Sequence, residues 1–154
     1  MVVHLIRPYL IALVGLAVGA ALGTVATALA RRRMSSTLSG WDARLTVPLL
    51  LAAAGAHLVL IPAVELQRQV MFGLYVAALT VVVVMAIAGF RIWRVGAIVL
   101  PVGSIAAYAY FAIVGHSADV AGIAVKIVEL GAILAAVKPL LVRSKSGAEQ
   151  RIPT

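Results

Sequence analysis

Five side chains that can bind or release a proton interrupt otherwise apolar stretches of the sequence. They are His57, Tyr75, Tyr108, Lys126 and Glu129. Ionisable groups inside an apolar helix normally face a bundle interior or a wet cavity, where they can serve proton movement, a quinone, a lipid headgroup or another ligand. Lys126 and Glu129 are three residues apart, so on a helix they share one face and can pair. These residues are the candidate polar site.

A purely structural interpretation stands beside the functional one. Lys126 and Glu129 could form an ion pair, with Lys126 extending towards the membrane surface and His57 bonded to a neighbour, and so tie helices together. Proton relays usually place several acids in series, whereas Glu129 is the one carboxylate deep in an apolar stretch. The residue types therefore favour the structural interpretation and leave the functional one open.

Other reaction chemistry is poorly represented. The sequence contains no nucleophile elbow, phosphate-binding glycine loop or HExxH motif, and it has no cysteine for disulfides or thiolate metal sites. His4 and His116 lie outside the depth of His57, which disfavours a haem held by two histidines. His4, His116, Asp119 and Glu65 are metal-ligand types without a motif spacing. We therefore expect no catalysis, haem or metal; the sequence is compatible with a bound lipid.

The elements that must position these residues follow from hydropathy. The chain has 154 residues, 64% of them hydrophobic, and a mean hydropathy of +1.12, which is more apolar sequence than a soluble core of this size can bury. Apolar segments lie at 9–30, 47–64, 71–90, 95–115 and 120–142, and each is long enough to cross a bilayer as a helix. The sequence predicts an all-α integral membrane protein: one five-transmembrane-helix bundle over residues 1–142, then a flexible basic cytoplasmic tail, 143–154.

These spans place the polar residues at similar depth. At about 1.5 Å per residue, His57 lies about 11 Å, Lys126 about 9 Å and Glu129 about 14 Å below the outer ends of their spans. Tyr75 and Tyr108 fall in the same outer half. Four helices are thus expected to bring the candidate site together as a polar pocket that opens to the outer face.

Three further residues have expected local roles. Pro48 is expected in the first turn of its span, where proline is tolerated. Pro101 is expected to kink the fourth span, and the hydroxyl of Ser104 to bond the carbonyl that the proline frees.

Charge asymmetry predicts the orientation. With the N-terminus outside, ten cationic residues fall on cytoplasmic segments and two, Arg7 and Arg68, on outer ones, as the positive-inside rule requires. The ten are Arg31, Arg32, Arg33, Arg44, Arg91, Arg94, Lys138, Arg143, Lys145 and Arg151. The formal net charge of +8 therefore reflects topology rather than nucleic-acid binding.

Interface residues fit the same orientation. Trp41 and Trp93 are expected at the inner interface, and the outer one is expected to hold Tyr9, Phe72, Tyr75, Tyr110 and Phe111. Arg31, Arg32 and Arg33 are expected to contact anionic lipid headgroups. This triple arginine, directly after a long apolar run, also favours a retained first span over a cleaved signal peptide. We expect a multi-pass protein of a bacterial plasma (inner) membrane.

The first span carries a ridge of small residues. Gly15, Gly19, Gly23 and Thr27 recur every fourth position, so they line one helix face and let another helix approach closely. That neighbour could be a helix of the same chain or of another protein.

Three short motifs carry a family resemblance: Ala56-His57-Leu58, the segment 103–108 (GSIAAY) and Val128-Glu129-Leu130. Through them the chain resembles small predicted membrane proteins of high-GC Gram-positive bacteria. The resemblance implies a compact helical bundle of uncharacterised function, with His57, Tyr108 and Glu129 in one constellation. Those proteins are usually read as having four spans, which would make the glycine-bearing first span an addition or a divergent element.

Taken together, the sequence favours an accessory or structural subunit that packs against a larger membrane complex, such as a respiratory or other energy-converting one, with the glycine ridge as one docking face. The alternative is a small protein that handles a ligand, proton or lipid in the polar pocket, as a monomer or homo-oligomer. A quinone- or haem-linked redox subunit is the third option.

Overall fold

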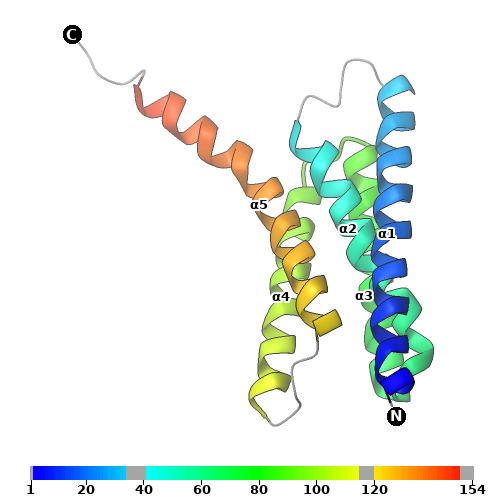
Figure 1. Ribbon diagram of the computed structural model, residues 1–154. Helices are drawn as coiled ribbons and strands as arrows, with labels where there is room; N and C mark the ends of the chain where they lie inside the picture. Colours follow the sequence, from blue (N-terminus) through cyan, green and yellow to red (C-terminus); the bar gives the residue numbers. More distant parts are fainter. Residues whose placement is uncertain (1, 34–40, 115–119, 150–154) are drawn as a thin grey trace.

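The computed structural model describes residues 2–33, 41–114 and 120–149, and the side chains of 10–32, 43–114 and 120–138. This part of the chain is helical throughout, apart from short connections (Figure 1). The helices are α1 (Val2–Arg33), α2 (Trp41–Leu60), the 3-10 turn η1 (Ile61–Ala63), α3 (Leu66–Ile87), α4 (Trp93–Ile113) and α5 (Val120–Glu149).

All five α-helices contain a segment long and apolar enough to cross a membrane. They run alternately up and down, so α1 begins at one end of the bundle and α5 ends beyond the other (Figure 1). An all-helical bundle with five such helices is what the hydropathy pattern predicted, and the structure confirms it.

Helix ends differ from the predicted span limits. α2 begins at Trp41 instead of Val47, which places Pro48 inside the helix and not in its first turn. α3 begins at Leu66 and ends at Ile87. Two residues later Gly89 has a φ of 81°, a backbone conformation that glycine adopts without strain. α5 continues to Glu149, so residues 143–149 of the expected tail are helical, and 150–154 lie outside the described residues.

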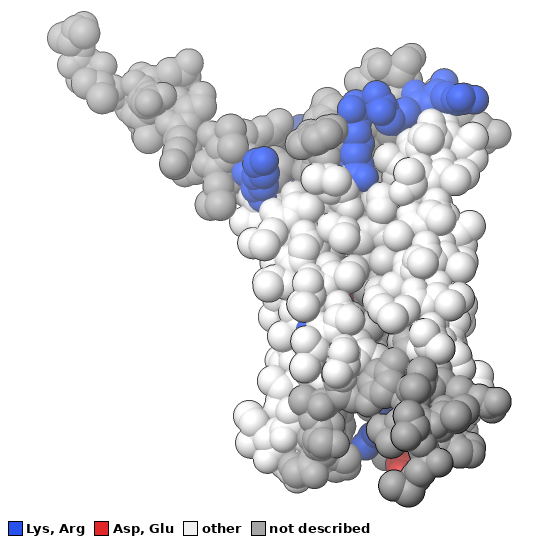
Figure 2. Space-filling view, in the orientation of Figure 1, with Lys and Arg blue, Asp and Glu red and all other residues white. Residues whose placement is uncertain are grey.

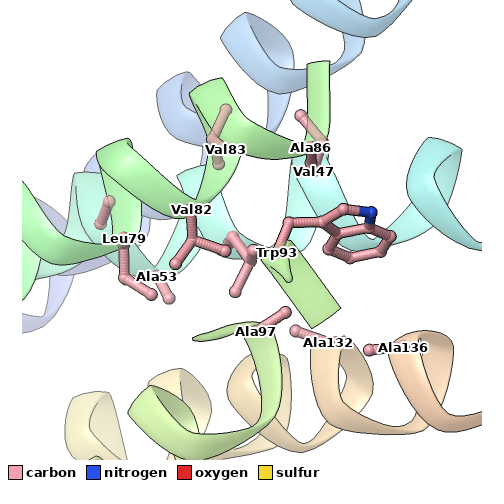
Figure 3. Packing of buried hydrophobic residues seen from close by; sticks show 12 residues of the cluster. Val47, Ala53, Leu79, Val82, Val83, Ala86, Trp93, Ala97, Ala132 and Ala136 are labelled. Carbon is pink, nitrogen blue, oxygen red and sulfur yellow. The ribbon is translucent and has the colours of Figure 1, made fainter. Parts of the chain in front are cut away.

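The hydrophobic core lies between α2, α3, α4 and α5 (Figure 3). Small residues dominate it, and they let the helices pack closely around Leu50 and Leu79, which are fully buried. Trp93 belongs to this core, with 6% of its surface exposed. Trp93 is the first residue of α4, at the end of the bundle where α1 ends, and its indole packs among the surrounding alanines instead of facing outwards. The side chain of Trp41 lies outside those described.

α1 packs mainly against α2, through the glycine ridge. A Cβ added at Gly15 would meet the carbonyl of Gly55, and one at Gly19 would overlap the backbone of Leu51. Further along, Gly23 faces the backbone of Pro48 in the same way. Thr27 continues the ridge, and its hydroxyl donates to the Gly23 carbonyl at 2.7 Å. The ridge is thus occupied by a helix of the same chain, which corrects the expectation that it docks a partner.

Lys and Arg side chains gather at the end of the bundle where α1 ends, above a broad band that is almost entirely white (Figure 2). The described cations on this side are Arg31, Arg32, Arg44, Arg91, Arg94 and Lys138. We call this side the basic end. Arg68 and Glu65 lie at the opposite end, beside the start of α3.

Candidate functional site

Glu129 is the centre of the candidate site. It lies in the first third of α5 and is completely buried, although its carboxylate is surrounded by apolar helices. Its Oε1 accepts hydrogen bonds from the Tyr75 hydroxyl of α3 at 2.9 Å and from the Ser104 hydroxyl of α4 at 3.0 Å. A buried carboxylate is tolerated when donors satisfy its oxygens, and here two other helices supply them.

Lys126 supplies the countercharge. It lies one turn before Glu129 on the same face of α5, and its Nζ donates to Glu129 Oε2 at 2.8 Å. The same ammonium donates to Ser104 Oγ. Ser104 therefore accepts from the lysine and donates to the glutamate, which joins the three groups in a ring. The lysine side chain keeps 14% of its surface exposed, whereas that of Glu129 has none.

His57 approaches the carboxylate from α2. Its Nδ1 lies 2.8 Å from the carbonyl oxygen of Ala53. Because a carbonyl only accepts, Nδ1 carries the proton of this bond. The other nitrogen, Nε2, faces Glu129 Oε1 at 4.0 Å, too far for a hydrogen bond. In the neutral ring Nε2 is an acceptor, so two acceptors face each other across this gap. A proton on either one would turn the contact into an attractive one.

Aromatic rings surround the imidazole and the ammonium. Phe72 and Tyr75 meet the His57 ring edge to face, with centroids 5.0 and 4.8 Å away. The Tyr108 ring lies on the far side of Lys126, with its centroid 5.8 Å from Nζ. Gly122 makes room for that ring, since a Cβ there would overlap the tyrosine.

The cluster is closed towards the basic end. The positions one helical turn from the site residues in that direction are Ala53, Leu79, Pro101 and Ala132, and all four are fully buried. On the other side of Glu129, Phe72, Tyr108 and Lys126 are each only half-buried. Access to the carboxylate is therefore easier from the end where α5 begins, past Lys126.

The structure brings His57, Tyr75, Lys126 and Glu129 into one cluster, with Tyr108 at its edge against Lys126. At the centre of this cluster Glu129 has no exposed surface, and the side chains of Tyr75, Ser104 and Lys126 pack directly against its carboxylate.

Sequence reasoning missed Ser104 as a site residue. It bonds Glu129 and Lys126, whereas the prediction assigned its hydroxyl to a freed carbonyl. Its position four residues before Tyr108 puts both on one face of α4 and could have identified it. Phe72, expected towards the outer interface, is half-buried, and its ring packs on His57.

Among the described residues, no group of three or more His, Cys, Asp or Glu side chains could hold a metal ion. The side chains of His4, His116 and Asp119, considered above as metal ligands, lie outside that part of the chain. Comparison of the sequence with protein-family models, with curated proteins and with solved structures found no match.

Proposed function

We propose that this chain is a small membrane protein that binds a proton, in exchange with one side of the membrane, at the Glu129 carboxylate. The observation that carries the proposal is the pair of facing acceptors, His57 Nε2 and Glu129 Oε1, held 4.0 Å apart inside the helix bundle. Packing alone would not require two such groups, since burying them costs free energy.

One feature supports binding from one side of the membrane, and a second predicts which side that is. The buried layer of Ala53, Leu79, Pro101 and Ala132 separates the carboxylate from the basic end. The positive-inside rule makes the basic end cytoplasmic, so the proton would come from the outer side, with the N-terminus outside as well. The polar cluster would then lie in the outer half of the bilayer.

Infrared difference spectroscopy of the lipid-reconstituted protein tests the proposal. A carboxyl C=O stretching band should appear when the pH is lowered, and it should be absent from Glu129→Gln. Glu65→Gln is the matched control, because Glu65 is an exposed carboxylate at the end of the bundle and its loss should leave this buried-carboxyl band in place. An identical pH-dependent band in the wild type and Glu129→Gln would overturn the proposal.

An accessory role in a larger membrane complex is the second candidate. The observation that favours it is that the apolar α4 is the least buried of the five helices. The outer face of α4, and not the occupied glycine ridge, would contact other subunits. Native purification in mild detergent followed by mass spectrometry tests it: a stoichiometric membrane partner supports this role, and a protein purified alone or as a homo-oligomer contradicts it.

A further inference from the structure

The ammonium of Lys126 occupies an arrangement of groups that suits ammonium ions in general. Glu129 Oε2 accepts one of its hydrogen bonds at 2.8 Å, Ser104 Oγ accepts another, and the Tyr108 ring centroid lies 5.8 Å away. A carboxylate, a hydroxyl oxygen and an aromatic face are together the groups that proteins use to recognise such cations. None of these contacts requires the cation to be attached to α5.

The recognising groups are held in place, whereas their occupant is on a flexible stem. Glu129 is completely buried. Gly122, which has no side chain, leaves the space that the Tyr108 ring occupies beside the site. Lys126, by contrast, retains exposed surface, and its long side chain can extend towards the membrane surface while its head leaves the cluster. The ammonium can therefore depart without any movement of the helices.

We propose that the position of Lys126 Nζ is a binding site for a small ammonium cation, either ammonium itself or a primary alkylammonium, which displaces the chain's own lysine. Exchange of one monovalent cation for another preserves the charge balance beside Glu129, whereas an anion would add a second negative charge. The inference rests on the proposed function, because both need the Glu129 carboxylate, and it adds the class of ligand.

Chemical rescue of Lys126→Ala tests the site. The variant should have a lower thermal midpoint than the wild type in detergent, and methylammonium chloride should raise that midpoint in a saturable way. Tetramethylammonium chloride at the same ionic strength should not, because it has no N–H to donate to Oε2 and Oγ. The double variant Lys126→Ala/Glu129→Gln is the matched control and should not respond. Equal shifts with both salts, or no shift at all, would overturn the proposal.

A second measurement uses the wild-type protein and does not depend on the stability of a variant. Acetylation by an amine-reactive ester, read by mass spectrometry, gives the ratio of modification at Lys126 to that at Lys138, an exposed lysine on the same helix. Displacement by methylammonium should raise this ratio until it saturates. Methylammonium also consumes the reagent, but both lysines lose equally and the ratio corrects for it. A constant ratio would contradict displacement.

The two proposals fail separately. A Glu129-dependent carboxyl band without any effect of methylammonium would leave the proton site standing and remove the cation site. Rescue by methylammonium without a pH-dependent Glu129 band would remove the proton site and leave the cation site.

Discussion

At the scale of single residues, the buried charge of Glu129 determines the chemistry of the bundle. An ion of this size costs several kcal/mol to bury, and breaking a buried pair by removing one partner costs about 3–5 kcal/mol. Glu129 is compensated by one ammonium and two hydroxyls, which come from α3, α4 and its own helix. Each donor therefore stabilises both the charge and the arrangement of the helices.

Tyr75→Phe tests one of these donors. The change removes the hydrogen bond to Glu129 Oε1 and keeps the ring against His57. We expect the protein to lose on the order of 1 kcal/mol of unfolding free energy, the usual net contribution of such a bond. Denaturation in mixed detergent measures the loss. Tyr110→Phe is the control, because that tyrosine is 63% exposed on α4. Equal stability of Tyr75→Phe and the wild type would show that this bond contributes nothing.

Residue depth could be predicted from sequence, but residue orientation could not. Counting along the spans put His57, Tyr75, Lys126 and Glu129 at one level, and the structure brings these four together. The same counting gave no information about which way Ser104 or Trp93 points. Those directions depend on the rotation of α4 about its axis, which is set by packing against α3 and α5 and not by the local sequence.

At the scale of helices, the contact between α1 and α2 is the tightest feature of the fold. Glycine lies on both sides of it, at Gly15 and Gly19 on α1 and at Gly55 on α2. Such close approach brings many backbone atoms into van der Waals contact, which drives helix association where lipid surrounds the helices. The sequence predicted the ridge, but it could not identify the opposing helix, because Gly55 lies in a separate run of small residues.

Gly19→Leu should force these helices apart. Its side chain would overlap the Leu51 backbone, and we expect a loss of about 1–3 kcal/mol or complete separation of α1. The readout is the thermal midpoint in detergent. Gly103→Leu on α4 is the matched control, since a Cβ there meets nothing within 4 Å. Comparable midpoints for the two variants would mean that the α1–α2 contact does not stabilise the protein.

Helix limits were harder to predict than helix existence. Pro48 is typical of a first turn, and it suggested that α2 begins near Val47. α2 nevertheless starts at Trp41, because polar residues such as Asp42 and Arg44 are compatible with a helix that continues past the apolar segment. The missing N–H of Pro48 lies inside the helix, at the position where Gly23 of α1 comes closest.

At the scale of the whole molecule, the five described α-helices alternate in direction, so α1 begins at one end of the bundle and α5 ends beyond the other (Figure 1). The described cations concentrate at one end of the bundle (Figure 2), and this asymmetry predicts that end to be cytoplasmic. The hydropathy pattern was sufficient to predict five helices, since lipid leaves the backbone no alternative to internal hydrogen bonding.

Epitope tags at both ends test this arrangement. The cell wall and any outer membrane are first removed, with the plasma membrane left closed. An added protease should then digest a tag at the N-terminus. It should digest a tag at the C-terminus only after the plasma membrane is opened. Tags that are both accessible from the same side would contradict the five-span topology. The reversed pattern would contradict the orientation alone, and the polar cluster would then face the cytoplasm.

The pairing of Lys126 with Glu129 on one helix has a consequence for biosynthesis. α5 follows α3 and α4 in the chain, so it leaves the ribosome after the two helices that carry its hydroxyl donors. A lone carboxylate would resist transfer from the insertion machinery into lipid. Because the opposite charge is only three residues away, α5 brings its own counterion, and the nascent segment can partition into the bilayer before it meets the rest of the bundle.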